Sequence, residues 1–186
     1  MARALTGMVL AIATSWILAT PASAEVTRST TGYASVFLTH ETAGEVDVFV
    51  PFDVFAPEGI DAFGRGEVFV QGYECTSEES VPATVSGLSS ATAQGTLDLV
   101  CSSPEREVTG HAEIDLVWTA DGPVERTTTA GRFSPCVTHL QVRHAGVTGS
   151  MTIVIPDLGV DVVVTPPGDD DDSIRQERSL CHPSRG

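Results

Sequence analysis

Apolar and polar side chains alternate with a period of two over residues 33–165, and no part of the chain carries a helical stripe over three turns. Because successive side chains of a strand point to opposite faces of a sheet, this alternation predicts strands with one buried and one solvated face. The segment 111–120 has the clearest pattern, since Leu116 and Trp118 fall on one face and Glu113 on the other. We therefore expect an all-β domain in which Trp118 anchors the core.

Short segments carry this alternation, and glycine, proline and aspartate residues separate them. Strands punctuated in this way are typical of antiparallel folds with tight turns. We predict an antiparallel β-sandwich of about 8 to 9 short strands, or alternatively a β-barrel, followed by an acidic C-terminal tail. The expected strands are 32–41, 45–55, 67–75, 95–101, 111–120, 124–133, 136–145, 151–157 and 160–165.

The first residues have the pattern of an export signal. Arg3 precedes the apolar run MVLAIATSWILA, and the small residues at 22–24 form a cleavage site. We expect residues 1–24 to be a signal peptide, 25–165 a single β-sandwich domain, and 166–186 an acidic, partly disordered tail. The apolar run is shorter than the roughly 20 residues of a membrane-spanning helix. The protein is therefore expected to be secreted and extracellular, with no membrane association after cleavage.

The chain is strongly acidic, with 25 Asp and Glu residues against 10 Lys and Arg and a formal charge of −15. Such a surface repels phosphate backbones and anionic lipid headgroups, so we expect no nucleic-acid partner. An unknown extracellular protein or glycan is the expected partner. The sequence contains no lysine, which excludes a Schiff base and a phosphate-loop lysine. No cofactor is expected.

Four cysteines lie beyond the signal segment, and an even count in an exported chain predicts two disulfides. Three pairings are possible. We favour Cys75 with Cys101, because these residues end consecutive predicted strands, and Cys136 with Cys181, because this bond would tether the tail. Metal binding by the thiols is disfavoured, because no Cys-x-x-Cys spacing occurs.

Four consecutive aspartates follow a Pro-Pro-Gly break near the C-terminus. Calcium requires several oxygens that converge on one point, and natural loops space their carboxylates at alternate positions. Consecutive side chains of an extended segment point to opposite sides, so only alternate members of the run could share a cation. We interpret the run as a solvated tether and treat its members as weak candidates for a metal site: Asp169, Asp170, Asp171 and Asp172.

No motif identifies a catalytic centre. His139 and His144 are an odd number of positions apart on one predicted strand, so they fall on opposite faces and cannot grip one metal. The chain has neither a His-Glu-x-x-His nor a Gly-x-Ser-x-Gly motif. Its low aromatic content, 6%, counts against a sugar-processing groove. We predict no enzyme activity, with a triad assembled in three dimensions around His40, His111 or His144 as the alternative.

Two features are candidates for a binding surface. Phe49 and Phe55 lie on the polar face of segment 45–55, where they either pack under the following loop or form an exposed aromatic patch. That strand also contains Pro51, which predicts an edge position or a bulge. The loop APEGIDAFGRGE follows, and long loops often carry functional residues. Its candidates are Glu58, Asp61 and Arg65.

The segment AEIDLVWTADGPVERTTTAGRF combines a strand ending in Trp-Thr, a Gly-Pro turn and an Arg-Thr-rich strand that leads to Arg-Phe. With the export signal and the acidic β-rich body, it resembles uncharacterised exported β-rich proteins of high-GC bacteria. The resemblance implies a β-domain and transfers no catalytic residue. We expect a secreted, non-catalytic β-domain with a binding or surface-associated role. A small secreted hydrolase and a secreted inhibitor or partner subunit are the alternatives.

Overall fold

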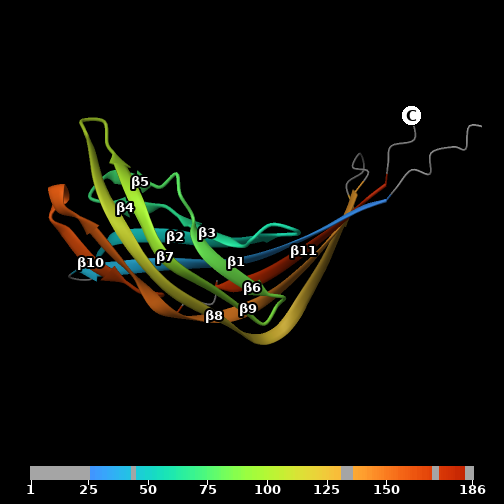
Figure 1. Ribbon diagram of the computed structural model, residues 1–186. Helices are drawn as coiled ribbons and strands as arrows, with labels where there is room; N and C mark the ends of the chain where they lie inside the picture. The colour runs from blue at the N-terminus through green and yellow to red at the C-terminus, as the bar shows by residue number, and fades with distance from the viewer. Residues whose placement is uncertain (1–25, 43–44, 131–135, 169–171, 183–186) are drawn as a thin grey trace, which may run out of the picture.

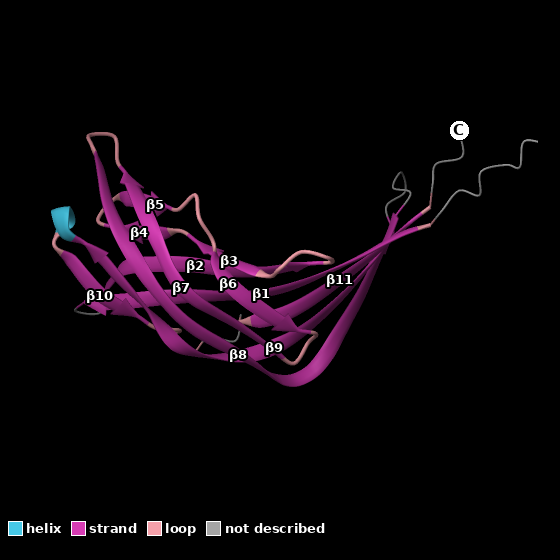
Figure 2. Ribbon diagram, in the orientation of Figure 1, coloured by secondary structure: helices cyan, strands magenta, loops and turns pink. Residues whose placement is uncertain are grey.

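The computed structural model describes residues 26–42, 45–130, 136–168 and 172–182, so the predicted signal peptide lies outside the described residues. The described chain is almost entirely antiparallel β-structure, which confirms the predicted fold class (Figures 1 and 2). One turn of 3-10 helix, η1 (Pro156–Leu158), joins two strands. The strands are β1 (Thr27–Thr42), β2 (Glu45–Pro57), β3 (Phe63–Gly66), β4 (Val68–Val70), β5 (Tyr73–Thr76), β6 (Val81–Ser86), β7 (Ser90–Ser102), β8 (Glu107–Ala130), β9 (Cys136–Ile155), β10 (Val160–Val164) and β11 (Ser173–Cys181).

The strand pairings close on themselves in a ring. The hydrogen-bonded order is β1-β11-β9-β8-β7-β5-β4-β2, and β2 pairs in turn with β1. β3 and β6 form a second connection from β2 to β7, and β10 extends β9. The inward side chains of β1 and β2 pack against those of β7, β8 and β9, so a single apolar core fills the ring as it would fill a sandwich.

Trp118 joins the two sides of this core. Its side chain is fully buried, and its ring stacks on that of Phe52 with 6.3 Å between centroids. Its indole Nε1 donates a hydrogen bond to the backbone carbonyl of Ser35, 3.0 Å away. A buried indole N–H needs such an acceptor. The prediction that Trp118 anchors the core is therefore confirmed.

Pro51 lies inside the sheet, so the predicted edge position for β2 is wrong. The alternative of a bulge at Pro51 is also wrong, because the register of β2 is continuous through Pro51 on both sides. β2 pairs with β1 along one side, and on its other side with β4 at Val48 and Phe49 and with β3 over 52–55. Pro51 falls where the partner changes from β4 to β3, and its carbonyl accepts a hydrogen bond from the Glu67 N–H at 3.2 Å. The missing N–H of proline therefore falls at a break in the ladder, where its loss is tolerated.

Several predicted strand boundaries are also wrong. The predicted segment 111–120 and the part of 124–133 that the structure describes, 124–130, form one long strand, β8. The Asp-Gly-Pro sequence at 121–123 makes an irregularity in the pairing of β8 with β9 and not a chain reversal. The predicted strand 67–75 is instead a tight hairpin of β4 and β5, turned by Gln71 and Gly72, both of which have positive φ.

The two longest strands, β8 and β9, run beyond the core together with β1 and β11. We call this extension the arm, and it consists of residues 27–32, 124–130, 136–143 and 175–181. Figure 2 shows these four strands leaving the rest of the ring side by side. All of the residues 124–130 are exposed, so this part of the arm has no buried core. Hydrogen bonds between its strands and the Cys136–Cys181 disulfide stabilise the arm instead.

The prediction that the chain after residue 165 is a tail is wrong for its second half. Residues Ser173–Cys181 form β11, which pairs with β1 on one side and with β9 on the other. Ile174 supplies the apolar side chain that makes this possible, because it is fully buried in the core. Cys181 does tether the segment, as predicted.

Both favoured disulfides are confirmed. Cys75 is bonded to Cys101 across the pair β5 and β7, and Cys136 to Cys181 across β9 and β11. No free cysteine occurs in the described part of the chain. The two bonds indicate an oxidising environment.

Candidate functional site

The outward face of β1 to β4 carries a row of aromatic side chains. Inward positions of β1 and β2 hold core residues such as Leu38 and Phe52, so the alternating positions point outward. We call the outward row the aromatic strip. It consists of Tyr33, Phe37, Phe49, Phe55, Phe63 and Phe69.

One end of the strip is a cluster of three rings. Phe55 lies opposite Tyr33 of β1 on one side and opposite Phe63 of β3 on the other. The Tyr33 and Phe55 rings meet edge to face at 5.6 Å, and the Phe55 and Phe63 rings stack at 5.5 Å. The Arg65 guanidinium carbon lies 5.1 Å from the centre of the Phe63 ring, within the range of a cation-π contact.

The other end is a second cluster of three rings. The Phe37 and Phe49 rings stack with centroids 5.5 Å apart, and Phe49 contacts Phe69 of β4 at 6.2 Å. Phe37 is 42% exposed and Phe49 37%, so both residues are partly open to solvent although their rings stack on one another. Phe49 and Phe55 are six positions apart on β2, and Tyr33 and Phe37 are four positions apart on β1, so the two clusters are separated by about 13 to 20 Å.

Acidic side chains lie between and beside the clusters. Asp53, on the outward face of β2, is opposite Ser35 of β1 and Arg65 of β3. Burial raises the pKa of Asp53 and the charge of Glu67 raises it further, while Arg175 has the opposite effect. The carboxylate can therefore gain from hydrogen-bond donors that a ligand would supply.

Two hollows lie along the strip. The larger, of about 520 Å³, is lined by rings of the first cluster and by polar groups, among them Asp53, Phe55, Phe63, Arg65, Glu67 and Thr76. The second, of about 430 Å³, lies beside the other cluster, and its lining includes Asp47, Phe49, Phe69, Tyr73 and Glu74. Both hollows therefore combine ring faces with carboxylates.

The predicted binding-surface residues separate in the structure. Phe49 is 37% exposed and belongs to one cluster of the strip, as the exposed-patch alternative predicts. Phe55 is half-buried in the other cluster, where it stacks on Phe63 of the segment that was predicted to be a loop, and Arg65 lies over the same ring. Glu58 instead accepts a hydrogen bond from the Thr30 backbone N–H at 2.9 Å. Asp61 is exposed on the loop before β3. Phe63 and Phe69 were missed, because β3 and β4 were not predicted as separate partners of β2, and Tyr33 and Phe37 were missed because the pairing of β1 with β2 was not predicted.

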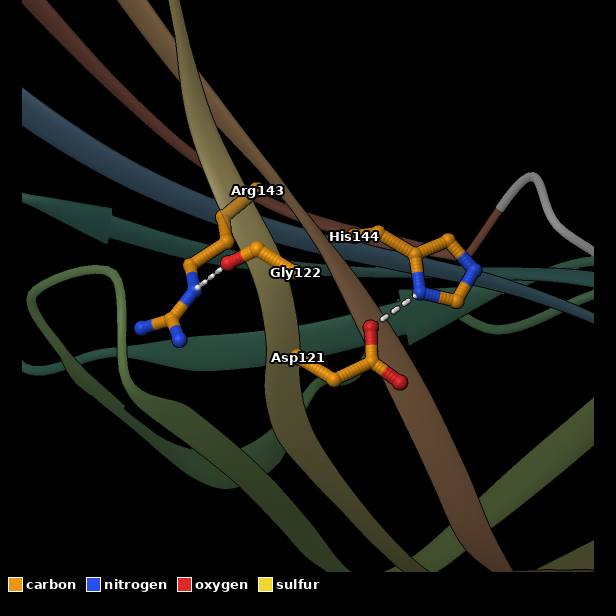
Figure 3. A network of polar contacts seen from close by, with 4 residues as sticks. All are labelled: Asp121, Gly122, Arg143 and His144. Atoms are coloured by element: carbon orange, nitrogen blue, oxygen red, sulfur yellow. Dashed lines mark hydrogen bonds and ion pairs between the residues drawn. The ribbon is translucent and has the colours of Figure 1, made fainter.

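A cluster of polar side chains lies outside the strip, where the pairing of β8 with β9 is irregular between Ala120 and Val124. Figure 3 shows Asp121 and His144 pointing toward one another, with 2.5 Å between the carboxylate Oδ1 and the imidazole Nδ1. Ser173 lies opposite His144 in the sheet, so a serine, a histidine and an aspartate come together on one face. However, Ser173 is only 6% exposed, and its hydroxyl accepts a hydrogen bond from the Arg175 Nε at 3.0 Å. This limited access disfavours Ser173 as a nucleophile.

The other histidines have separate surroundings. The His40 Nδ1 lies 3.3 Å from the Val163 carbonyl, and the His139 Nδ1 lies 3.0 Å from the Thr128 hydroxyl. His111 is opposite Val154. Within the described ranges, no group of three or more His, Cys, Asp or Glu residues could hold a metal ion.

The aspartate run is only partly described. Asp169, Asp170 and Asp171 lie outside the described residues. Asp172 is 4% exposed, and its backbone carbonyl accepts a hydrogen bond from the Ala145 N–H at 3.0 Å. Asp172 is therefore buried against the sheet and is not part of a solvated tether. In the part of the chain that the structure covers, no helix has the length and apolarity needed to cross a bilayer.

Comparisons with protein-family models, with curated proteins and with solved structures yield no match to this chain. The resemblance of residues 112–133 to exported β-rich proteins therefore stays a prediction.

Proposed function

We propose that this protein is a secreted, non-catalytic carbohydrate-binding domain, and that the aromatic strip is its binding surface. The observation that carries the proposal is the pair of three-ring clusters on the outward face, with Asp53 between them. In a chain with few aromatic residues, six of the eleven aromatic side chains gather in one row. Exposed apolar groups gathered in this way typically mark an interaction surface.

The ring faces suit the apolar faces of sugar rings. An aromatic face carries partial negative charge and attracts the weakly positive C–H groups of a sugar that lies flat on it. The stacked rings of Phe37 and Phe49 are accessible for such a contact, because more than a third of each side chain is exposed. The separation of about 13 to 20 Å between the clusters suits a chain of several linked sugars.

The carboxylates favour a hydroxyl-rich ligand over a protein. Covering Asp53, Glu67 and Asp47 with an ordinary protein surface would remove water from these charges, which is costly without a matched cation for each. Sugar hydroxyls can donate hydrogen bonds to the same carboxylates without any counter-charge. A neutral glycan therefore satisfies both the rings and the acids of the strip.

The extracellular setting has independent support. Two disulfides indicate an oxidising compartment, and the sequence predicts an export signal at residues 1–24. Such a compartment would bring the strip into contact with cell-surface and environmental polysaccharides.

Isothermal titration calorimetry with neutral hexasaccharides of glucose, mannose and xylose tests the proposal. We expect one-to-one binding of at least one of them. Phe49→Ala and Phe63→Ala should each weaken it at least about tenfold, because each change removes a ring from one cluster. Val163→Ala is the matched control, since Val163 is 51% exposed on β10, outside the strip. The proposal is wrong if none of the three sugars binds, or if the control weakens binding as much as the ring variants do.

A further inference from the structure

The two faces of the arm carry different charges. Directly paired residues point to the same side of a sheet, so the register divides the arm into two faces. One face continues the inward side of the ring and holds Arg28, Arg126 and Arg178, with no acidic residue among its paired positions. The opposite face holds the acidic side chains Glu125 and Glu177. A protein with a net charge of −15 thus has a locally basic surface.

Two paired rows on the basic face form the wall of a hollow. In one row Arg126 of β8, Gln141 of β9 and Gln176 of β11 are neighbours, and in the next row Thr128, His139 and Arg178 are neighbours. The hollow has a volume of about 330 Å³, and these six side chains line it together with Leu180. The hydroxyl of Thr128 lies 3.0 Å from the His139 Nδ1, which holds the imidazole in place.

Both Arg126 and Arg178 line this hollow. Arg126 and Arg178 are two strands and two residues apart, so their Cα atoms are separated by about 12 Å and both long side chains can reach one ligand. Both residues are exposed. Among the described residues, neither forms an ion pair with a carboxylate. Glu58, which approaches the base of the arm, is bonded to the Thr30 backbone N–H.

We propose that this hollow is a binding site for a small oxyanion, such as a phosphate or sulfate group. Guanidinium groups form paired, charge-assisted hydrogen bonds to oxyanions, and Arg126 and Arg178 supply two of them. The amides of Gln141 and Gln176 and the hydroxyl of Thr128 supply further donors. Every polar group named on the wall of the hollow can donate a hydrogen bond, which suits a ligand that only accepts.

A small ligand fits this site better than a polyanionic chain. At physiological ionic strength charges are screened beyond about 8 Å, so the arginines of the arm attract only those anionic groups that lie close to them. A long polyanion would extend past the arm to the acidic remainder of the molecule, where like charges repel. A single phosphate or sulfate group would contact only the arm.

Titration calorimetry of the full disulfide-bonded protein at low ionic strength tests the site with inorganic phosphate, sulfate and glucose 6-phosphate. We expect saturable one-to-one binding. Arg126→Gln and Arg178→Gln should each weaken it about tenfold to a hundredfold. Arg175→Gln is the matched control, because Arg175 lies on the same strand as Arg178 but faces the other side of the sheet. Circular dichroism establishes that each variant is folded.

The outcomes are distinguishable. Tighter binding of glucose 6-phosphate than of inorganic phosphate supports the site and identifies a sugar phosphate as its ligand, whereas the reverse order supports it with the free ion as ligand. Absence of saturable binding to all three probes overturns the proposal. An equal loss in Arg175→Gln overturns it too, because binding would then depend on overall charge. Much tighter binding of dextran sulfate than of any small probe would overturn the preference for a small ligand.

Discussion

Phe49 and Phe52 are the same residue type on the same strand, and the structure assigns them opposite roles. Phe52 is 1% exposed, stacks on Trp118, and covers Gly64 and Gly66 of β3, where an added Cβ would lie 2.7 Å from its ring. Replacing Phe52 with alanine would empty this space, because neither glycine has a side chain that could fill it. Such a change costs about 3 to 5 kcal/mol of the free energy of unfolding. For a domain of this size, the melting temperature should fall by about 6 to 20 °C.

Phe49→Ala should behave differently. Phe49 is 37% exposed, and its ring contacts are with Phe37 and Phe69, each worth about 0.5 to 1.5 kcal/mol. Its melting temperature should therefore fall by only a few degrees. Urea and thermal unfolding followed by far-ultraviolet circular dichroism measure both variants. Equal losses of stability in the two variants, or a larger loss for Phe49→Ala, would refute the assignment of inward and outward faces.

Three further predictions concern the arm, the strip and the sheet. Replacing both Cys136 and Cys181 with serine should lower the free energy of unfolding by up to about 4 kcal/mol in the chain-entropy model. Amide hydrogen exchange should then rise first in the arm, and a uniform rise across the ring would contradict this order. Asp53→Asn should raise the melting temperature at pH 7, because the raised pKa of Asp53 means that its ionised form destabilises the fold. The gain should disappear below the ordinary carboxyl value of 3.8, where both states are protonated, and a gain that persists at pH 3 would exclude this cause. Gly149→Ala should prevent stable folding, since Gly149 has φ +105° and an added Cβ would clash with the Asp115 carbonyl oxygen. Gly146→Ala on the same strand should melt normally, because an added Cβ there would meet no atom within 4 Å.

Alternation and cysteine spacing were sufficient to predict the fold class, the core tryptophan and the disulfides. Trp118 was predictable because its apolar neighbours recur at every second position. The cysteine pairing was predicted because Cys75 and Cys101 end consecutive predicted strands and because a bond between Cys136 and Cys181 would tether the tail. The pairing holds although β6 lies between the strands of Cys75 and Cys101. These are local properties, and the sequence expresses them directly.

The ring and the aromatic strip depend on long-range pairing, which alternation alone does not specify. β11 was missed because its side chains are mostly polar on both faces, and only Ile174 reaches the core. β3 was missed because its glycines leave no apolar pattern, although Phe52 fills the space above them. Without β3 and β4 as neighbours of β2, Phe63 and Phe69 could not be placed beside Phe55 and Phe49.

Aromatic NMR of the phenylalanine-labelled protein tests most directly whether the strip is a carbohydrate-binding surface. Each ring signal is assigned by substitution, and the protein is then titrated with the neutral hexasaccharide that binds in calorimetry. We predict that signals of outward rings such as Phe37, Phe49 and Phe63 shift in a saturable manner while those of Phe52 do not. Unchanged strip signals in the presence of a bound sugar would contradict the account.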